Sequence, residues 1–534
     1  MTRSPLPFVL SLAACFGAPA PTPTIDATTE PSTSSTADTS TAPAPLSTAL
    51  QLDRMLAHLD RFQAIADDHG GHRSILSPGY LASADYVAEE LADYGYDVRR
   101  EAVPIALYVN DEAAFAQTSP DAVTYETGVE YVVSQFSGNG DIAADLVAID
   151  PLLPPGPTPN SSTAGCEATD FDGFPSGAVA LIQRGTCTFA AKYQNAVSAG
   201  ASAVVFFNEG QKGRTAPFVT QVGPGTLAAI PAVAIGYDLG ETLATAPTPA
   251  VTLTVEGRTR TGTDENVIAE TAGDPNQVVL VGAHLDSVPQ GPGINDNGSG
   301  AAFVLELARL FAERGSDPQQ QVRFAFWGAE EIGLVGSGAW LTDPATGGVD
   351  KAKVASLSAY LNFDMMASPN GVRFVIDGDG SDVPDIRYPA GSDAIEQRFL
   401  DWFAAEGLPT APSSAVTRFD TYWFAITGVP VGGVFSGAEA LKTEAQAATF
   451  GGTAGLAYDA CYHQACDTRD NVDPVLYEQL ARAAAHVSEQ LADPGPDAAP
   501  GRRSAAGAER GDLAPRMPPA ATGTCHHRVP TLIE

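Results

Sequence analysis

The sequence predicts an α/β fold in which helices cover a mixed, mainly parallel sheet on both faces. Two observations lead to this expectation. Short, uninterrupted apolar runs recur along the chain, and amphipathic segments of helical length separate them. Strands buried on both faces consist of continuous apolar residues, and strands that alternate with helices are typical of parallel sheets. Ligands of such sheets bind at the carboxyl ends of the strands, so functional residues are expected there.

The individual elements follow from the spacing of apolar residues. Residues 52–65 repeat leucine, phenylalanine and isoleucine at helical spacing. A second amphipathic segment covers residues 80–94 and ends at Gly95, where a helix C-cap is expected. Strands are expected at 278–281, 322–327, 360–363 and 429–435, and a helix at 301–311.

The composition is that of a soluble globular protein and argues against nucleic-acid binding. The 534 residues suffice for several domain-sized units, and 44% of them are hydrophobic, so the chain can bury large cores. Asp and Glu total 64 against 29 Lys and Arg, which gives a formal net charge of −35. Because phosphate binding relies on Lys and Arg, we expect no nucleic-acid partner.

The N-terminus predicts export. Arg3 precedes an apolar run at 6–14, which is too short to span a membrane but long enough for the core of a signal peptide. The run ends in Leu-Ala-Ala-Cys15, which resembles the bacterial lipobox with its lipidated cysteine; an ordinary cleaved signal is the alternative. We therefore assign residues 1–15 to a signal peptide and 16–48 to a disordered Ala/Pro/Ser/Thr linker. The mature protein is expected to be extracellular or lipid-anchored at the cell surface.

The other cysteines predict two disulfides, because exported proteins fold in an oxidising compartment. If Cys15 carries lipid, the close spacing favours the pairs Cys166–Cys187 and Cys461–Cys466. One further cysteine, near the C-terminus, is left without a partner.

That cysteine, Cys525, lies in a Pro-, Ala-, Gly- and Arg-rich segment at 493–534, which we expect to be disordered. Cys525 is followed by His526 and His527, and such a cluster could bind a metal. A solvated or processed tail fits the composition better.

Residues that can bind metals follow the predicted strands. They are His284 and Asp286 after the strand at 278–281, Asp296 after a glycine-rich loop, Glu330 and Glu331 after 322–327, Asp364 after 360–363, and His463 far along the chain. Each alone has a structural explanation, such as a hydrogen-bonded core histidine or a solvated glutamate at a helix start. Several carboxylates that converge on one crevice are costly unless cations neutralise them. Imidazole and carboxylate donors suit Zn²⁺, so the sequence predicts a site for two metal ions.

Five ordered motifs carry a specific resemblance. They are Gly-Ala-His284-Leu-Asp286-Ser-Val, Gly-Pro-Gly-Ile-Asn-Asp296-Asn-Gly-Ser-Gly, Trp-Gly-Ala-Glu330-Glu331, Asn-Phe-Asp364-Met365 and Cys461-Tyr462-His463. Over nearly all of residues 50–130 and 260–490 the chain resembles the secreted bacterial double-zinc aminopeptidases, which are leucyl aminopeptidase-like zinc metallopeptidases. The resemblance implies the zinc-dependent exopeptidase fold and two Zn²⁺ per chain.

The resemblance also implies a role for each motif residue. Asp296 is expected to bridge two zinc ions, one of them also held by His284 and Asp364 and the other by Glu331 and His463. Glu330 matches the general base, Asp286 the carboxylate that orients His284, and Tyr462 the phenol that stabilises the oxyanion. In this family the peptide bond after the bridging aspartate is cis, so the bond between Asp296 and Asn297 is expected to be cis.

Residues 131–258 do not belong to this pattern. The apolar runs at 177–189, 203–208 and 230–233, with a helix between the first two, resemble the protease-associated (PA) domain. We therefore expect a discontinuous peptidase domain at 49–130 and 259–492 with the PA domain inserted.

The resemblance says less about specificity. It implies that Met365 and Phe435 line the pocket for the first side chain of the substrate, which favours a large apolar residue. The segment at 418–424, beginning with Arg418, borders this pocket and departs from the family, in which relatives typically have Ser, a His after the Asp, and no Trp.

An acidic turn at 377–382 resembles a calcium loop, although Asp382 stands where an EF-hand has glycine. Ca²⁺ binding and a solvated turn are the two interpretations.

Together these features favour a monomeric zinc aminopeptidase that acts on peptide or protein N-termini and contacts a membrane only through a lipid on Cys15. One alternative is another enzyme on this fold, either a glutaminyl cyclase, which uses one zinc ion, or a carboxypeptidase. Another is an inert surface protein that binds through its PA domain. The complete set of five ligands favours the aminopeptidase over the cyclase, and the presence of Glu330 and Tyr462 argues against an inert protein.

Overall fold

The computed structural model describes residues 44–223, 226–382, 388–413 and 418–494. The expected signal peptide, Cys15, most of the expected linker, and Cys525 lie outside the described residues. In the described part of the chain, no helix combines the length and the apolarity needed to cross a membrane.

The folded chain is slightly longer at both ends than the sequence predicted. The short helix α1 (Leu46–Ala49) lies in the stretch assigned to the linker, and Leu46 is buried against α12 (Pro474–Ala492), where Glu489 accepts a hydrogen bond from its backbone N–H at 3.0 Å. At the other end, Asp493 was assigned to the tail, but its carboxylate accepts a hydrogen bond of 2.8 Å from the backbone of Gln319. The burial of Leu46 explains why the folded domain begins before the end of the stretch assigned to the linker.

The central sheet is mixed and mainly parallel, which confirms the predicted fold class. Four parallel strands form its middle, in the order β10 (Gln320–Trp327), β9 (Asp274–His284), β11 (Leu357–Phe363) and β14 (Val431–Phe435). Beyond β14 lie β12 (Phe374–Ile376), which is antiparallel to it, and β13 (Ala411–Ser413). On the other side, β10 pairs antiparallel with the long strand β8 (Ala250–Glu270).

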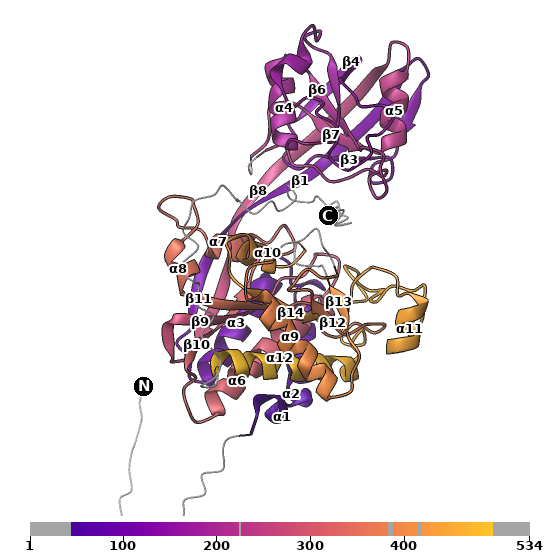
Figure 1. The fold of residues 1–534 in the computed structure, drawn as a ribbon. Coiled ribbons are helices and arrows are strands. Elements are labelled where there is room, and N and C mark those ends of the chain that lie inside the picture. Colours follow the sequence, from indigo (N-terminus) through magenta and orange to yellow (C-terminus); the bar gives the residue numbers. More distant parts are fainter. Residues whose placement is uncertain (1–43, 224–225, 383–387, 414–417, 495–534) are drawn as a thin grey trace, which may run out of the picture. The chain divides into compact units, whose positions relative to one another are not determined.

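Helices cover both faces of this sheet, as Figure 1 shows. One face packs against α2 (Leu52–Asp68), α3 (Pro78–Asp93), α6 (Gly300–Glu313), α9 (Ser392–Ala405) and α12. The other face packs against α7 (Val335–Trp340), α8 (Lys351–Ser356) and α10 (Thr421–Ile426). Within β9, Val279 and Val281 belong to the first core while Val278 and Leu280 belong to the second. This two-sided burial is why the strand is apolar without alternation.

Local signals set the helix ends. The side chain of Ser77 accepts a hydrogen bond from the backbone of Tyr80 at the start of α3, and Pro78 occupies the first turn, where a missing N–H costs nothing. After α3 the chain turns at Gly95 with φ of 95°, a conformation that favours glycine, as the sequence predicted.

The segment between the two parts of this domain continues the sheet beyond β8 and has its own cores. Strand β1 (Arg99–Ser119) runs antiparallel to β8 along almost its whole length, and β4 (Gly140–Ile149) pairs with the first part of β8. From β4 the strands β5 (Val179–Gln183), β6 (Ala203–Phe207) and β7 (Ala232–Ile235) continue in parallel, and β3 (Tyr131–Val133) closes the edge. The smaller elements are β2 (Val123–Tyr125), the 3-10 helix η1 (Ala168–Phe171), α4 (Phe189–Ser198) and α5 (Tyr237–Thr245).

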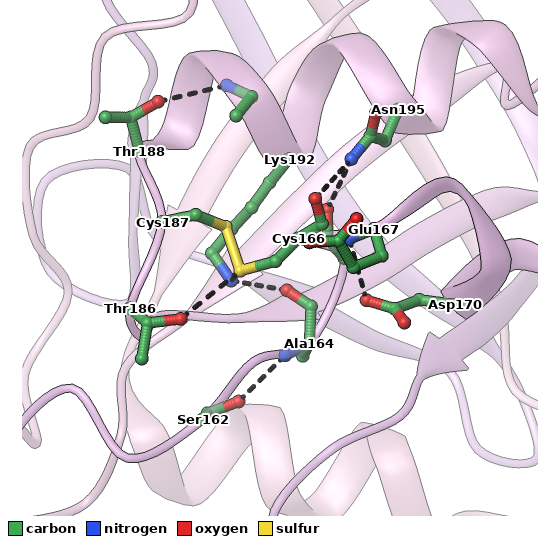
Figure 2. Close-up of a disulfide and its surroundings, with 12 residues drawn as sticks. Ser162, Ala164, Cys166, Glu167, Asp170, Thr186, Cys187, Thr188, Lys192 and Asn195 are labelled. Atoms are coloured by element: carbon green, nitrogen blue, oxygen red, sulfur yellow. Dashed lines mark hydrogen bonds between the residues drawn. A yellow bond between two sulfur atoms is a disulfide. The ribbon is translucent and has the colours of Figure 1, made fainter.

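Both predicted disulfides are present. Cys166 and Cys187 are joined near the start of α4 (Figure 2), and Cys461 and Cys466 close a loop that precedes α12. A separate short helix, α11 (Glu444–Phe450), has no buried residue and lies in the excursion between β14 and that loop.

Candidate metal centre and active site

Three neighbouring strands deliver the expected metal ligands to one edge of the sheet. His284 is the last residue of β9 and lies opposite Trp327, the last residue of β10. Asp364 directly follows β11, which pairs in parallel with the other side of β9. Because parallel strands present their carboxyl ends at the same edge, ligands far apart in the sequence meet there.

The bridging candidate, Asp296, lies in an irregular helical turn, η2 (Ile294–Ser299), before α6. The peptide bond between Asp296 and Asn297 is cis, as expected. The backbone N–H of Asp296 donates to the carboxylate of Asp467 at 3.0 Å. At the start of α6, Gly300 allows close packing, since a Cβ there would lie 2.0 Å from the carbonyl oxygen of Phe363.

A buried arginine that the sequence analysis missed holds the segment between His284 and Asp296. The guanidinium of Arg73 donates hydrogen bonds to the carbonyl oxygens of Leu285, Pro292 and Gly293 at 2.5, 2.9 and 2.6 Å. Its side chain is fully buried. No local pattern marks Arg73, because its partners lie more than two hundred residues away.

The five candidate ligands form two groups that share Asp296. His284 Nε2 lies 3.3 Å from Asp296 Oδ1 and 3.4 Å from Asp364 Oδ1. His463 Nε2 lies 3.1 Å from Asp296 Oδ2 and 3.0 Å from Glu331 Oε2. The expected ligands are thus brought together in the pairing that the resemblance implied.

The donor geometry fits zinc. Two ligands of a tetrahedral zinc ion with bonds of about 2.0–2.1 Å lie about 3.3–3.4 Å apart, close to the spacings in each group. Asp296 Oδ2 and Glu331 Oε1 are buried without a hydrogen-bond partner among the described residues, although oxygen atoms of this kind are normally satisfied. Imidazole nitrogens and carboxylate oxygens without a cysteine suit a hard or borderline cation. The site could therefore hold two metal ions, with Asp296 between them.

The pKa shifts of the site residues also favour the binding of cations. Burial raises the pKa of Glu330 well above its usual value, and burial with the nearby Asp296 raises the pKa of Glu331 to about 7. Burial opposes protonation of His463, but Glu331 and Asp296 outweigh it and raise its pKa to about 10. Without a metal ion, the protein therefore favours the protonated forms of these side chains. Bound cations would take the place of those protons.

The turn that carries Glu330 and Glu331 is fixed by hydrogen bonds. The carboxylate of Asp286 accepts the backbone N–H groups of Glu330 and Glu331 at 3.1 and 3.3 Å. The free ring nitrogen of His284, Nδ1, lies 3.1 Å from the backbone carbonyl oxygen of Asp286 and 3.6 Å from its carboxylate. The carboxylate of Asp286 thus binds the glutamate turn and also lies beside His284, so its expected role of orienting His284 stays a prediction.

Residues 418–424, where the sequence departs from the expected family pattern, contact the loop that begins at Glu330. In α10, the indole N–H of Trp423 donates to the carbonyl oxygen of Leu334 at 2.9 Å, and the carboxylate of Asp420 accepts a hydrogen bond from Ser337. Trp423 thus braces the end of the loop that begins at Glu330.

Tyr462 and His463 lie on the loop closed by the Cys461–Cys466 disulfide. Their rings stack with centroids 3.8 Å apart, and Arg418 donates to the phenol oxygen of Tyr462 at 3.3 Å and to Glu439 at 3.0 Å. Burial raises the pKa of Tyr462 well above its usual value, so the phenol keeps its proton and can donate it in a hydrogen bond.

A pocket opens beside these groups. Its polar side is formed by Glu330, Arg418, Tyr462 and four of the candidate ligands, which are Asp296, Glu331, Asp364 and His463. Its apolar side is formed by Met365, Phe419, Phe435 and Ala438. The structure therefore places the expected pocket residues Met365, Arg418 and Phe435 together beside the candidate ligands.

Two aspartates that the sequence analysis did not single out support this loop. Asp459 accepts hydrogen bonds from the backbone of Cys461 at 2.8 Å and from the side chain of Asn295 at 2.6 Å. Asp467 accepts the backbone N–H groups of Asn295 and Asp296. The only signal was their position beside the two cysteines, which does not reveal a partner.

The acidic turn considered for calcium brings Asp377, Asp379 and Glu396 close together. These carboxylates accept hydrogen bonds from amides of their own turn, including those of Gly378, Ser381 and Asp382. The cluster offers oxygen ligands, several of which also accept hydrogen bonds from the turn, so calcium binding here stays a prediction.

Comparisons with known proteins agree with this geometry. Residues 266–488 match the profile of peptidase family M28, and residues 142–243 match that of the PA domain. An aminopeptidase of Pseudomonas aeruginosa is 42% identical over 84% of this chain and 82% of its own length. A probable lipoprotein aminopeptidase of Mycobacterium tuberculosis, LpqL, is 37% identical over 80% of this chain and 82% of its own length.

Solved structures share the fold. The aminopeptidase from Aneurinibacillus sp. strain AM-1 has a TM-score of 0.64 at 23% identity, covering 84% of this chain and 96% of its own. BSAP, a zinc aminopeptidase from Bacillus subtilis, has a TM-score of 0.52 at 20% identity, covering 83% and 96%. The likeness covers most of this chain, so its fold is one already seen in solved structures.

Proposed function

Because this chain belongs to peptidase family M28 and contains an inserted PA domain, we propose that it is an exported, monomeric zinc aminopeptidase that removes N-terminal residues from peptides. The observation that carries the proposal is the pair of buried donor groups that share Asp296. The names of the relatives support the activity, and the lipoprotein in the name of the mycobacterial relative supports a lipid anchor on Cys15.

Two zinc ions are proposed to bind here, one at His284, Asp296 and Asp364 and the other at Asp296, Glu331 and His463. When bound, zinc supplies Lewis acidity that activates water and polarises the scissile carbonyl group. The zinc in the name of BSAP supports this choice of metal.

Glu330 is proposed to be the general base. It is buried at the pocket, directly precedes the ligand Glu331, and makes no ion pair with a described residue within 4.0 Å. Its carboxylate is therefore available to take a proton from the attacking water and to deliver it to the leaving amine. The hydrogen bond from its backbone to Asp286 keeps the side chain in place.

Tyr462 is proposed to stabilise the oxyanion that forms from the substrate carbonyl. Its phenol lies at the pocket, beside His463, and its oxygen already accepts a hydrogen bond from Arg418. With one lone pair occupied, the hydroxyl proton is directed elsewhere and can point toward the substrate.

The pocket is proposed to select large apolar N-terminal residues. Met365, Phe419 and Phe435 present an apolar surface that gains free energy by removing such a side chain from water. The free α-amine of the substrate is proposed to lie near Glu330 and Asp364, whose carboxylates attract a cation.

The test combines metal analysis with substrate discrimination. The purified full-length protein is analysed for zinc, and its hydrolysis of leucyl anilide is compared with that of the N-acetylated anilide. We expect two zinc ions and loss of hydrolysis on acetylation. One zinc ion would favour a glutaminyl cyclase, and indifference to acetylation would exclude recognition of the free amine.

A further inference from the structure

A buried lysine in the PA domain lies beside a disulfide and contacts no residue of the proposed reaction in the described part of the chain. Lys192 lies in the first turn of α4, whose N-terminus is capped by the side chain of Thr188. Its side chain is fully buried. Its ammonium donates to the carbonyl oxygen of Ala164 and, at 3.7 Å, to the sulfur of Cys166, which Figure 2 shows.

This ammonium has no carboxylate as a partner. Among the described residues, no carboxylate oxygen lies within 4.0 Å of Lys192 Nζ, whereas buried charges in proteins are normally paired. Its two contacts are a neutral carbonyl oxygen and a disulfide sulfur, which is a weak acceptor. Burial lowers the pKa of Lys192 to about 8, so the amine is still mostly protonated at neutral pH.

The two sulfur atoms have different surroundings. Cys166 Sγ contacts the hydroxyl oxygen of Thr186 at 3.4 Å in addition to Lys192. Within the described residues, Cys187 Sγ takes part in no hydrogen bond, and both cysteines are partly exposed. A negative charge would therefore be stabilised on Cys166 much better than on Cys187.

We propose that Cys166–Cys187 is an exchangeable disulfide and that small-molecule thiols open it by attack at Cys187. The attacking thiolate forms a bond to Cys187 Sγ, and the bond between the two cysteines breaks. Its electron pair leaves on Cys166 Sγ as a thiolate, which pairs with the ammonium of Lys192. A second thiolate then attacks the mixed disulfide, which yields the oxidised small molecule and a Cys187 thiolate that takes up a proton from water.

The physical reason is the charge created on the leaving sulfur. A neighbouring cation stabilises a thiolate, and a better-stabilised thiolate leaves faster. In the disulfide form, the buried cation of Lys192 faces the neutral sulfur of Cys166. Reduction converts this sulfur to a thiolate, whose negative charge pairs with the ammonium. The modification site is thus Cys187, with Lys192 as a positioning residue, and neither depends on the proposed peptidase function.

The first experiment measures the reduction equilibrium. Oxidised full-length protein is equilibrated in dithiothreitol redox buffers at pH 7.5, trapped by alkylation and quantified by mass spectrometry. An opposite charge at this distance lowers a thiol pKa by about 1–3 units. Lys192→Met is therefore expected to disfavour reduction about tenfold, which equals about 30 mV for this couple. An unchanged midpoint would overturn the proposal.

Two controls separate this effect from a change in folding. Lys212→Met removes an exposed lysine of the same domain and is expected to leave the midpoint unchanged. Lys192→Arg keeps the charge and is expected to stay close to the wild type. The Cys461–Cys466 disulfide, to whose sulfurs no described lysine donates, serves as the internal reference in every sample.

The second experiment needs no variant. Wild-type protein is treated briefly with reduced glutathione, trapped with acid and alkylating reagent, and digested. The proposal requires the glutathione adduct on Cys187 and the alkylated thiol on Cys166. An adduct mainly on Cys166 would overturn it, even if Lys192→Met did not fold.

Discussion

The buried histidine His58 is expected to make the stability of the peptidase domain depend on pH. His58 lies on α2, its Nδ1 is 2.5 Å from the hydroxyl of Tyr86 on α3, and its buried Nε2 has no hydrogen-bond partner among the residues that the structure describes. Burial lowers the pKa of His58 to about 4; Glu306 opposes this effect, and Arg54 and Arg309 add to it. Protonation of the folded state would place an additional cation in a poorly solvated position.

The sign and size follow from linkage. The unfolded chain binds a proton to His58 below pH 6.5, whereas the folded chain binds it only below about 4. Above pH 6.5, His58 is neutral in both states, so its titration does not reduce the free energy of unfolding. As the pH falls from 6.5 toward 4, only the unfolded chain takes up the proton, so the free energy of unfolding decreases. At about 1.4 kcal/mol per pH unit, the loss amounts to about 3 kcal/mol, a large part of a typical domain's stability.

The assay is urea unfolding followed by tryptophan fluorescence at several pH values between 7.5 and 4. His58→Gln removes the titration, so the free energy of unfolding of the wild type is expected to fall about 3 kcal/mol more than that of the variant. His69→Gln, at the end of the same helix, is the control and is expected to follow the wild type. Parallel curves for wild type and His58→Gln would refute the reasoning, because the other titrating groups are common to both proteins.

Three further predictions concern the candidate active site. Glu330→Gln is expected to keep both zinc ions and the fold while kcat falls about 10²- to 10⁴-fold, as measured by metal analysis and steady-state kinetics; retained turnover would exclude the general-base role. Asp296→Asn is expected to bind less zinc than the wild type, because one carboxylate is shared by both donor groups; two zinc ions held as tightly as before would contradict the bridging role. Phe435→Ala is expected to raise the KM for leucyl anilide about tenfold more than that for alanyl anilide, because the apolar wall loses contact area with the larger side chain; an equal effect on both substrates would place Phe435 outside the specificity pocket.

The central strands and the helices α2, α3 and α6 could be predicted because their signals are local. Uninterrupted apolar runs identified β9, β10 and β11, and their ends located His284 and Asp364 without knowledge of the fold. Strand β14 begins at Val431, later than expected, because Val429 packs in the core but precedes the paired residues. Periodicity locates a buried residue without showing whether its backbone joins a sheet.

The groups that hold the ligands could not be predicted in the same way. Arg73 occupies a loop between two helices, and its three acceptors are backbone carbonyls, which every residue has. Asp467 accepts backbone N–H groups of a segment far away in the sequence. Neither interaction leaves a pattern of residue types, so only the folded chain reveals it.

The hydrogen bonds around Asp296 explain why ligands from separate strands keep their spacing. The side chain of Asn297 donates to the carbonyl oxygen of Phe363 at 2.9 Å and accepts the backbone N–H of Met365 at 3.1 Å, so it holds both neighbours of Asp364. On the other side, Asn295 donates to Asp459 in the loop that carries His463.

The two asparagines that flank Asp296 therefore tie it to one ligand of each donor group. Asp286, two residues after His284, links His284 to Glu331, because its carboxylate accepts the backbone N–H of Glu331. The connections of Asn297 use backbone atoms and its neutral amide, whereas those to Asn295 and Glu331 end on the carboxylates of Asp459 and Asp286. The protein thus sets the distances between carboxylates and imidazoles through hydrogen bonds to the residues beside the ligands, which is what preorganisation of a metal centre requires.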